Sequence, residues 1–159
     1  MPEPHVSRSD LSISKATPLD VPAIRSMVDA AYSKYIERIG KLPAPMAADY
    51  HQVIREKDVF VLQDQHQMVG SIVLHDDPAS SSIIIDNVVV DPTSQGKGYG
   101  RVLMDYATDV ARSQGRSALT LYTNVKMYEN LALYAKIGFM ETGRRTEEGF
   151  ERVYFRKDI

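Results

Sequence analysis

The segment 83–90 constrains the fold of this chain more than any other, because it is apolar at every position except Asp86 and Asn87. A strand of this kind is typical of the middle of a sheet that is covered on both faces. Asp91 and Pro92 follow it, and a proline cannot continue a central ladder of hydrogen bonds. We therefore expect a layered α/β fold with the segment 83–90 near the centre of its sheet.

The remaining elements follow from hydrophobic periodicity and from turn residues. Helices are predicted from Thr17 to Gly40, over 46–56, after the glycine-rich segment 95–100, and over 127–136. Further strands are predicted over 11–16, 59–62, 68–74, 118–122, 139–144 and 150–156, with turns at 64–67 and 147–149. This order indicates one mixed α/β domain over residues 11–159, after a flexible N-terminus over residues 1–10.

Composition excludes several classes of function. The chain has no cysteine, which removes disulfides, thiolate metal sites and a cysteine nucleophile. Its four histidines show no paired spacing, so we expect no metal site. A net charge of -2 gives no basic field for nucleic acid or for an anionic membrane. No apolar run is typical of a signal peptide or a membrane span, and we expect a cytoplasmic protein.

The segment 95–100 reads Gln-Gly-Lys-Gly-Tyr-Gly and lies between a buried strand and an amphipathic helix. Glycines there allow the backbone to turn sharply and to approach a ligand closely. The N–H groups at the start of the helix have no partners inside it, and the helix dipole favours an anion beside them. Lys97 and Arg101 add positive charge. The segment predicts a phosphate-binding loop, and a glycine-rich turn without a ligand is the alternative.

Two other kinds of glycine loop do not match this segment. A dinucleotide-binding fingerprint that begins at Gly96 needs a third glycine where the chain has Arg101. A P-loop needs four residues between its first glycine and a Gly-Lys-Ser/Thr triplet, and the segment lacks that arrangement.

The loop, after a strand that ends in Val-Val-Val-Asp-Pro, resembles the acyl-CoA pyrophosphate loop of the GNAT N-acetyltransferases. The family usually has Arg or Gln at the first position, which is Gln95 here. A second stretch, Asn124 and residues 130–139, is similar to the family's asparagine, alanine, tyrosine and glycine-phenylalanine signature. The resemblance covers nearly the whole chain after Leu11. It implies a central, mixed, mostly antiparallel sheet flanked by helices, and acetyl-CoA as the co-substrate.

The resemblance also implies how the cofactor is held. In the family the central strand splays from its neighbour, and the pantetheine arm lies against backbone groups that correspond to Val88 and Val90. A backbone N–H near Val88 or Val89 polarises the thioester carbonyl. Asn130 hydrogen-bonds the cofactor from the start of the last helix. The pyrophosphate lies on the backbone N–H groups of Gln95, Gly96, Lys97, Gly98, Tyr99, Gly100 and Arg101.

Tyr134 is the candidate that protonates the leaving thiolate. A phenol has a pKa of about 10 and a thiol one of about 8.5, so complete proton transfer is uphill by roughly 2 kcal/mol. Tyr134 is therefore expected either to donate a hydrogen bond to the developing charge or to act as a general acid with a lowered pKa. The alternative is a core tyrosine in step with Met127 and Leu131 on the inner face of its helix.

The acceptor amine must lose a proton, because an alkylamine with a pKa of about 10.4 is charged at pH 7. Asp86 is the candidate base, since it is an acid on an otherwise apolar strand, where burial demands partners. Capping a turn or pairing with an arginine are its alternative roles. Glu37 and Asp49 are further candidates for the base. Because the chain has no cysteine, direct attack in a ternary complex is preferred over a covalent enzyme intermediate.

The acceptor itself is the least constrained part of the hypothesis. Tyr32, Tyr35 and Tyr50 lie in a segment that mixes aromatic and charged groups, which predicts either a small polar pocket or the outer face of two amphipathic helices. The leading hypothesis is N-acetylation of a small-molecule or peptide amine. The alternatives are a non-catalytic acyl-CoA-binding module and an acyltransferase with another acyl group or acceptor. The family resemblance is compatible with a homodimer.

Four arginines gather in the closing hairpin, at positions 144, 145, 152 and 156. Alternation along the strands separates some of them, so they do not predict a nucleic-acid surface. We expect solvated side chains that pair with Glu147, Glu148 and Glu151.

Overall fold

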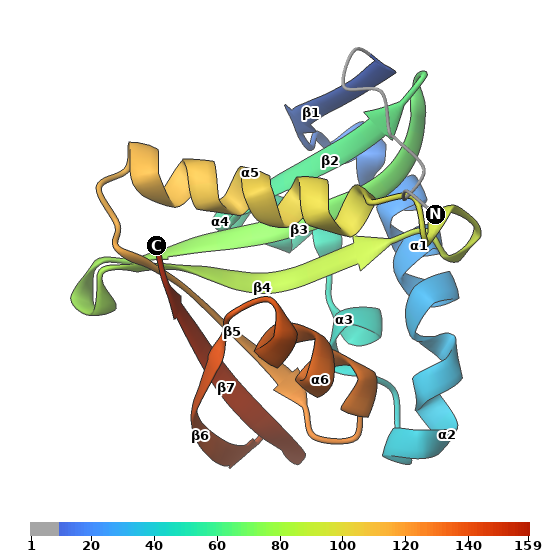
Figure 1. Ribbon diagram of the computed structural model, residues 1–159. Helices are drawn as coiled ribbons and strands as arrows, with labels where there is room; N and C mark the ends of the chain where they lie inside the picture. Colours follow the sequence, from blue (N-terminus) through green and yellow to red (C-terminus); the bar gives the residue numbers. More distant parts are fainter. Residues whose placement is uncertain (1–9) are drawn as a thin grey trace, which may run out of the picture. The chain divides into compact units, whose positions relative to one another are not determined.

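The computed structural model describes residues 10–159, in which seven strands form one mixed sheet in the order β1-β2-β3-β4-β5-β7-β6 (Figure 1). The strands are β1 (Leu11–Lys15), β2 (Asp58–Asp64), β3 (Gln67–Asp77), β4 (Ser82–Val90), β5 (Ala118–Asn124), β6 (Met140–Glu147) and β7 (Phe150–Asp158). The helices are α1 (Val21–Tyr32), α2 (Ile36–Ile39), α3 (Ala44–Ala47), α4 (Tyr50–Glu56), α5 (Tyr99–Ser113) and α6 (Tyr128–Lys136).

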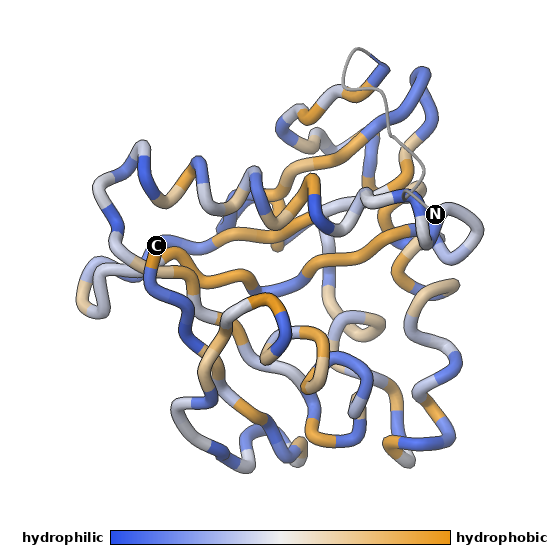
Figure 2. Tube along the Cα trace, in the orientation of Figure 1, coloured by the Kyte–Doolittle hydropathy of each residue, from blue (hydrophilic) through white to orange (hydrophobic). Residues whose placement is uncertain are grey.

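The sheet has the predicted mixed and mostly antiparallel character. The pair β4–β5 is parallel, whereas β1–β2, β2–β3, β5–β7 and β6–β7 are antiparallel. β4 contains the apolar segment 83–90 and stands fourth in the strand order, which confirms its central position. Figure 2 shows the apolar stretches of β3 and β4 in orange. The predicted α/β fold is confirmed.

The chain divides into two compact units that share several elements. The first unit comprises the described chain up to Leu74 together with Asn87–Tyr106, and the second comprises His75–Asp86 and Ala107–Ile159. The boundaries fall inside β3, β4 and α5. The predicted extent of the domain, residues 11–159, stays a prediction. The predicted flexible N-terminus lies outside the described residues except for Asp10.

The core of the first unit forms where the apolar stripe of α1 meets the strands. Its buried cluster includes Ile24, Met27 and Val28 from α1, and Val59, Val61, Val73 and Val89 from β2, β3 and β4. A 3₁₀ turn over Pro18–Asp20 precedes α1. Thr17 N donates a hydrogen bond of 2.8 Å to Asp20 Oδ2, as in a capping box. The predicted helix start is thus confirmed, with a 3₁₀ turn added before α1.

Two predicted helices are each broken once. The helix predicted from Thr17 to Gly40 is interrupted by a 3₁₀ turn over Ser33–Tyr35, whose tighter winding separates α1 from α2. The helix predicted over 46–56 is divided into α3 and α4, because Ala48 and Asp49 have extended backbones with ψ of 143° and 102°. The Asp49 side chain accepts from the backbone N–H of the residues that begin α4, which starts a new helix there.

The predicted turns of both hairpins are confirmed. Gln65 and His66, between β2 and β3, have φ of 51° and 70°, and Glu148 and Gly149, between β6 and β7, have φ of 53° and 78°. Two consecutive positive φ angles are the signature of a type I′ turn, whose twist matches that of the paired strands.

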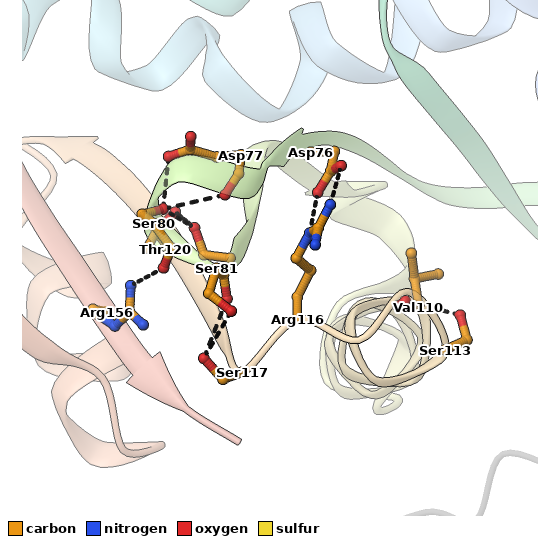
Figure 3. Close-up of polar contacts among 11 residues, drawn as sticks. Asp76, Asp77, Ser80, Ser81, Val110, Ser113, Arg116, Ser117, Thr120 and Arg156 are labelled. Carbon is orange, nitrogen blue, oxygen red and sulfur yellow. Dashed lines mark hydrogen bonds and ion pairs between the residues drawn. The ribbon is translucent and has the colours of Figure 1, made fainter.

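A polar network in the second unit joins the β3–β4 connection to the segment between α5 and β5 (Figure 3). Arg116 donates two hydrogen bonds, of 2.7 and 2.8 Å, to the carboxylate of Asp76. These bonds hold the pKa of Asp76 below its usual range. Ser117 N donates to Ser81 O at 2.8 Å. Arg156 of β7 donates to a carbonyl of the same connection. The network ties the β3–β4 connection both to the segment between α5 and β5 and to β7.

Candidate functional site

The predicted phosphate loop is an exposed segment of the first unit. Gly96 and Gly98 have φ of 85° and 86°, in the left-handed region that favours glycine. An added Cβ at Gly96 would meet nothing within 4 Å, so the backbone conformation rather than crowding requires glycine there. Asp91 shapes the approach, because its side chain accepts a hydrogen bond of 2.9 Å from Thr93 N. The loop therefore presents its backbone to solvent in a conformation that other residues rarely adopt.

The helix α5 begins directly after the loop, at Tyr99. Its ladder starts with a hydrogen bond of 3.2 Å from Val102 N to Gly98 O. The N–H groups of residues 98–101 precede this bond and have no acceptor inside the helix. The positive end of the helix dipole lies behind them, and the side chains of Lys97 and Arg101 are exposed. The loop and the first turn of α5 together suit an anion such as a phosphate.

The side chain of Tyr99 anchors the loop rather than facing solvent. It is buried, and its hydroxyl donates a hydrogen bond to Asp64 at the end of β2. This bond raises the pKa of Tyr99 to about 12. The backbone of Tyr99 is thus the part that remains for a ligand on the loop.

The last residues of β4 approach the start of α5 closely. Val89 is buried in the core of the first unit, whereas Val88 and Val90 are half-buried on alternate positions of the strand. A Cβ added at Gly100 would lie 3.8 Å from Val90 Cγ2. At Gly70 of β3, an added Cβ would lie 3.1 Å from Val89 O, so glycine there allows the backbone of β3 to come near β4. Of the three valines, Val89 is therefore buried in the core, and Val90 lies beside the start of α5.

Of the three tyrosines predicted for the acceptor, Tyr32 points to β4 and the other two are buried. The Tyr32 hydroxyl donates a hydrogen bond of 2.8 Å to Asn87 Oδ1. Tyr35 and Tyr50 are 6% and 3% exposed, so neither lies on the outer face of its helix. The Tyr50 hydroxyl donates to Pro45 O at 2.7 Å, and burial raises the pKa of Tyr50 to about 12. The structure brings Tyr32 and Asn87 together.

The candidates for a base have different surroundings. Asp86 is half-buried on β4, and its Oδ2 is shielded from solvent. Asp49 is exposed and accepts hydrogen bonds from His51 N and Gln52 N at the start of α4. Glu37 is exposed on α2. Asp86 is the most enclosed of the three carboxylates.

In the second unit, Tyr134 is buried on α6 among other aromatic rings. It is 9% exposed, and its ring centroid lies 5.7 Å from that of Phe139 and 6.0 Å from that of Phe155. Asn130, one turn earlier on the helix, donates a hydrogen bond of 3.4 Å to Thr123 Oγ1 on β5. The two candidates on α6 therefore both contact the β-strands of their own unit.

The parallel ladder between β4 and β5 ends before either strand does. Its last pair is Ile85↔Leu121, whereas β5 continues to Asn124 and β4 to Val90. Asp86 directly follows this last pair.

The family model for the acetyltransferase (GNAT) domain matches residues 55–141, which is more than half of the chain. This chain belongs to the GNAT acetyltransferase family. The matched region of this GNAT chain includes β4, the loop, α5, β5 and α6. It therefore contains both the glycine loop over residues 95–100 and the stretch that includes Asn124 and residues 130–139.

Other GNAT proteins are similar to this GNAT chain in part of the sequence or in fold. A mycothiol acetyltransferase of Jonesia denitrificans is 36% identical over 78 residues, which cover 49% of this chain and 25% of that protein. The chain thus matches a quarter of the length of this curated relative. A GNAT-family protein from Desulfovibrio desulfuricans has a TM-score of 0.75 at 18% identity, with 93% of this chain and 98% of the other covered.

A GNAT-family acetyltransferase from Elizabethkingia anophelis, solved with acetyl-CoA bound, has a TM-score of 0.69 at 17% identity. The similarity covers 96% of this chain and 100% of that one. At these identities the two structures establish the fold of the GNAT chain.

Sequence reasoning missed two features of this GNAT chain. The bond from Tyr99 to Asp64 joins residues 35 positions apart, and no local pattern indicates it. Arg152 is buried against aromatic rings instead of being solvated, although its predicted ion pair with Glu148 is present at 3.6 Å. No local pattern indicates this burial, because Tyr122 lies on β5, which is distant from Arg152 in the sequence. Among residues 10–159, no helix is long and apolar enough to cross a membrane.

Proposed function

We propose that this chain is an acetyl-CoA-dependent N-acetyltransferase, which moves an acetyl group to a primary amine by direct attack in a ternary complex. The observation that carries the proposal is the pair of left-handed glycines, Gly96 and Gly98, directly before the free N–H groups of α5. Membership of the GNAT family supports the choice of an acetyl-CoA pyrophosphate as the anion at this loop. The acetyl-CoA held by the relative from Elizabethkingia anophelis is consistent with that choice.

The proposed cofactor contacts divide between backbone and side chains. Backbone N–H groups from Gln95 to Arg101 bind the pyrophosphate, and Lys97 and Arg101 add positive charge beside it. Backbone groups of Val88 and Val90 hold the pantetheine arm, which fits a ladder between β4 and β5 that ends before these residues. Asn130 adds a side-chain hydrogen bond.

The proposed chemistry uses few groups of the protein. Acetyl-CoA, when bound, supplies a thioester whose carbonyl carbon accepts the amine nitrogen and whose sulfur leaves as a thiolate. A backbone N–H near Val88 or Val89 stabilises the negative charge that develops on the carbonyl oxygen. Asp86 accepts the proton that the amine loses, directly or through water.

Tyr134 then donates a hydrogen bond or a proton to the leaving sulfur. Its buried ring, held by Phe139 and Phe155, supports this role because packing fixes the direction in which the hydroxyl points. The same packing is what a purely structural tyrosine would show, so substitution at Tyr134 is the test that separates them.

The acceptor is proposed to be a small-molecule or peptide amine, and a cytoplasmic location and a homodimer stay predictions. The experiment measures thiol release from acetyl-CoA across a panel of amines, and CoA affinity by calorimetry on the same preparation. We expect CoA to bind and at least one amine to release thiol. CoA binding without turnover for any amine would contradict catalysis and favour a binding module. Turnover with longer acyl-CoA but not with acetyl-CoA would contradict the proposed acyl group.

A further inference from the structure

One face of the strands β5, β7 and β6 in the second unit carries tyrosines and arginines. The antiparallel register places Tyr122 opposite Tyr154. It also places Arg152 opposite both Asn124 and Arg145. Residues that are directly opposite on neighbouring strands lie on the same face of a sheet, so these five side chains share one face.

The helix α6 packs on the other face of the same strands. Thr123 and Phe155, which alternate with the residues of the tyrosine-arginine face, contact Asn130 and Tyr134 of α6. Side chains alternate between the two faces along a strand. The tyrosine-arginine face is therefore the one that α6 leaves uncovered.

The guanidinium of Arg152 is buried on this face without a close hydrogen-bond acceptor. Arg152 is 8% exposed, and its Cζ lies 4.5 Å from the ring centroid of Tyr122 and 5.7 Å from that of Phe150. Within the described residues its anionic partner is Glu148, whose Oε2 lies 3.6 Å from Nη2 and whose side chain is 79% exposed. A contact of that length is not a hydrogen bond, and a guanidinium has five N–H donors in its plane. Stacking on aromatic faces leaves these in-plane donors available for an anion.

Arg145 adds a second positive charge directly opposite Arg152. Its Cζ lies 4.7 Å from the ring centroid of Tyr154, and it forms no ion pair in the part of the chain that the structure describes. Like charges opposite one another on neighbouring strands repel. The nearby acid Glu147 accepts a hydrogen bond from the Tyr154 hydroxyl instead. The positive charge of Arg145 on this face is therefore not paired with a carboxylate of the described residues.

Ile85 of β4 pairs with Leu121, which in turn pairs with Phe155 on the face that α6 covers. The next residue, the proposed base Asp86, therefore belongs to the tyrosine-arginine face.

We propose that Arg152 and Arg145 bind a carboxylate of the acceptor, so that the substrate is an amino acid or a short peptide rather than a simple amine. This inference rests on the proposed function. A carboxylate accepts two parallel hydrogen bonds from the fork of a guanidinium, and its charge offsets the repulsion between the two arginines. The rings of Tyr122 and Tyr154 hold the guanidiniums in place for this contact.

Calorimetry on the CoA-saturated protein tests the site without requiring turnover. The ligands are N-acetyl amino acids and the corresponding N-acetyl amino acid amides, which differ by one carboxylate. We expect the wild type to bind the preferred acid at least about tenfold more tightly than its amide, as a charge-assisted bidentate contact implies. Arg145→Gln should abolish most of this preference and leave the affinity for the amide unchanged. Arg152→Lys, which keeps the charge but loses the fork, should weaken acid binding as well.

The matched control is Arg144→Gln. Arg144 neighbours Arg145 on β6 but lies on the opposite face, where it pairs with Glu141 at 2.7 Å. This variant should keep the wild-type preference for the acid. Equal affinity of the wild type for acids and amides would overturn the proposal. Weaker CoA binding by Arg145→Gln would also overturn it, because the guanidinium would then belong to a cofactor phosphate.

Thiol release on the same preparations separates this proposal from the proposed function. If amines are acetylated with no preference for those that carry a carboxylate, the proposed carboxylate site is wrong but the proposed acetyltransferase activity is supported. If the protein binds the acids more tightly than the amides but acetylates no amine, the proposed activity is wrong but the proposed carboxylate site is supported.

Discussion

The hydroxyl of Tyr32 at the end of α1 donates a hydrogen bond of 2.8 Å to the side-chain oxygen of Asn87 on β4. Asn87 directly precedes Val88, whose backbone belongs to the proposed carbonyl-binding position. The bond therefore ties a helix to the strand segment on which the proposed chemistry depends. It also gives Tyr32 a defined partner in the folded chain.

Tyr32→Phe should lower the free energy of unfolding by about 1 kcal/mol, because one neutral hydrogen bond is lost and the Asn87 oxygen stays half-buried. Turnover should fall together with stability if Asn87 positions Val88. Urea unfolding and initial rates measure the two effects. The control is Tyr106→Phe, since the Tyr106 ring packs on Phe60 and its hydroxyl has no hydrogen bond among the described residues. A Tyr32→Phe protein as stable as the wild type would argue against a stabilising bond.

Gly98→Val should weaken CoA binding by tenfold or more, on the order of 1.4 kcal/mol or above, because a β-branched residue resists the left-handed backbone of the loop. Calorimetry with CoA measures the loss, and thermal unfolding should show that the domain still folds.

The control for Gly98→Val is Gly115→Val. Gly115 has φ of 71° after α5, in the second unit, so the substitution imposes a similar backbone strain away from the loop. CoA affinity should stay at the wild-type value in this control. If Gly98→Val and the wild type bind CoA with the same affinity, the loop does not take part in cofactor binding.

Tyr134→Phe should reduce turnover by roughly 10²- to 10⁴-fold if the hydroxyl acts as a general acid, and less if it only donates a hydrogen bond. The ring contacts with Phe139 and Phe155 stay possible for phenylalanine, so CoA affinity should be retained. Rates measured across pH give the result. Tyr128→Phe is the control, because Tyr128 is on the same helix with 56% of its surface exposed. Unchanged turnover at every pH would assign Tyr134 to the core alone.

Alkaline unfolding should report the buried hydroxyl of Tyr50. Its pKa is raised from 10.0 to about 12, chiefly by burial, so the folded state favours the neutral phenol. The resulting stabilisation is complete below the unfolded-state pKa near 10 and is lost as pH rises through about 12. Tyr50→Phe does not titrate, and its free energy of unfolding should fall less steeply than that of the wild type between these pH values.

Urea unfolding at a series of pH values measures this difference. The pKa of Tyr99 is raised as well, chiefly by its hydrogen bond to Asp64. The free energy of unfolding of Tyr99→Phe should therefore also fall less steeply with pH than that of the wild type. Parallel curves for Tyr50→Phe and the wild type would mean that the Tyr50 phenol is not held neutral by the fold.

The sequence predicts the strands and most ends of helices and strands, because the residues that determine them are neighbours in the sequence. Pro92 stops β4, and Gly40, Gly115 and Gly138 end helical segments with positive φ. The loop before α5 is predictable for the same reason, since its glycines and the helix that follows are adjacent. The break at Ala48 and Asp49 was missed because Asp49 can be read either as a helical residue or as a cap.

The burial of Arg152 was not predictable, because it depends on which strands become neighbours. β6 and β7 follow one another in the chain, but β7 lies between β5 and β6 in the sheet, so Arg152 meets Tyr122 across a strand boundary. The hydrogen bond from Tyr99 to Asp64 depends in the same way on a distant strand. Roles that arise from such long-range pairing have no signature in the residues nearby.

The chain passes from one compact unit to the other inside β3, inside β4 and inside α5. Each unit therefore consists of two separate segments of the sequence. A single truncation of the chain cannot produce either unit whole. A cut at the turn over Pro78–Ser80 yields two polypeptides that each carry a portion of both units. The two halves should be inert when produced separately and regain CoA binding only by reassembly, which makes this turn a natural place for a split-protein reporter.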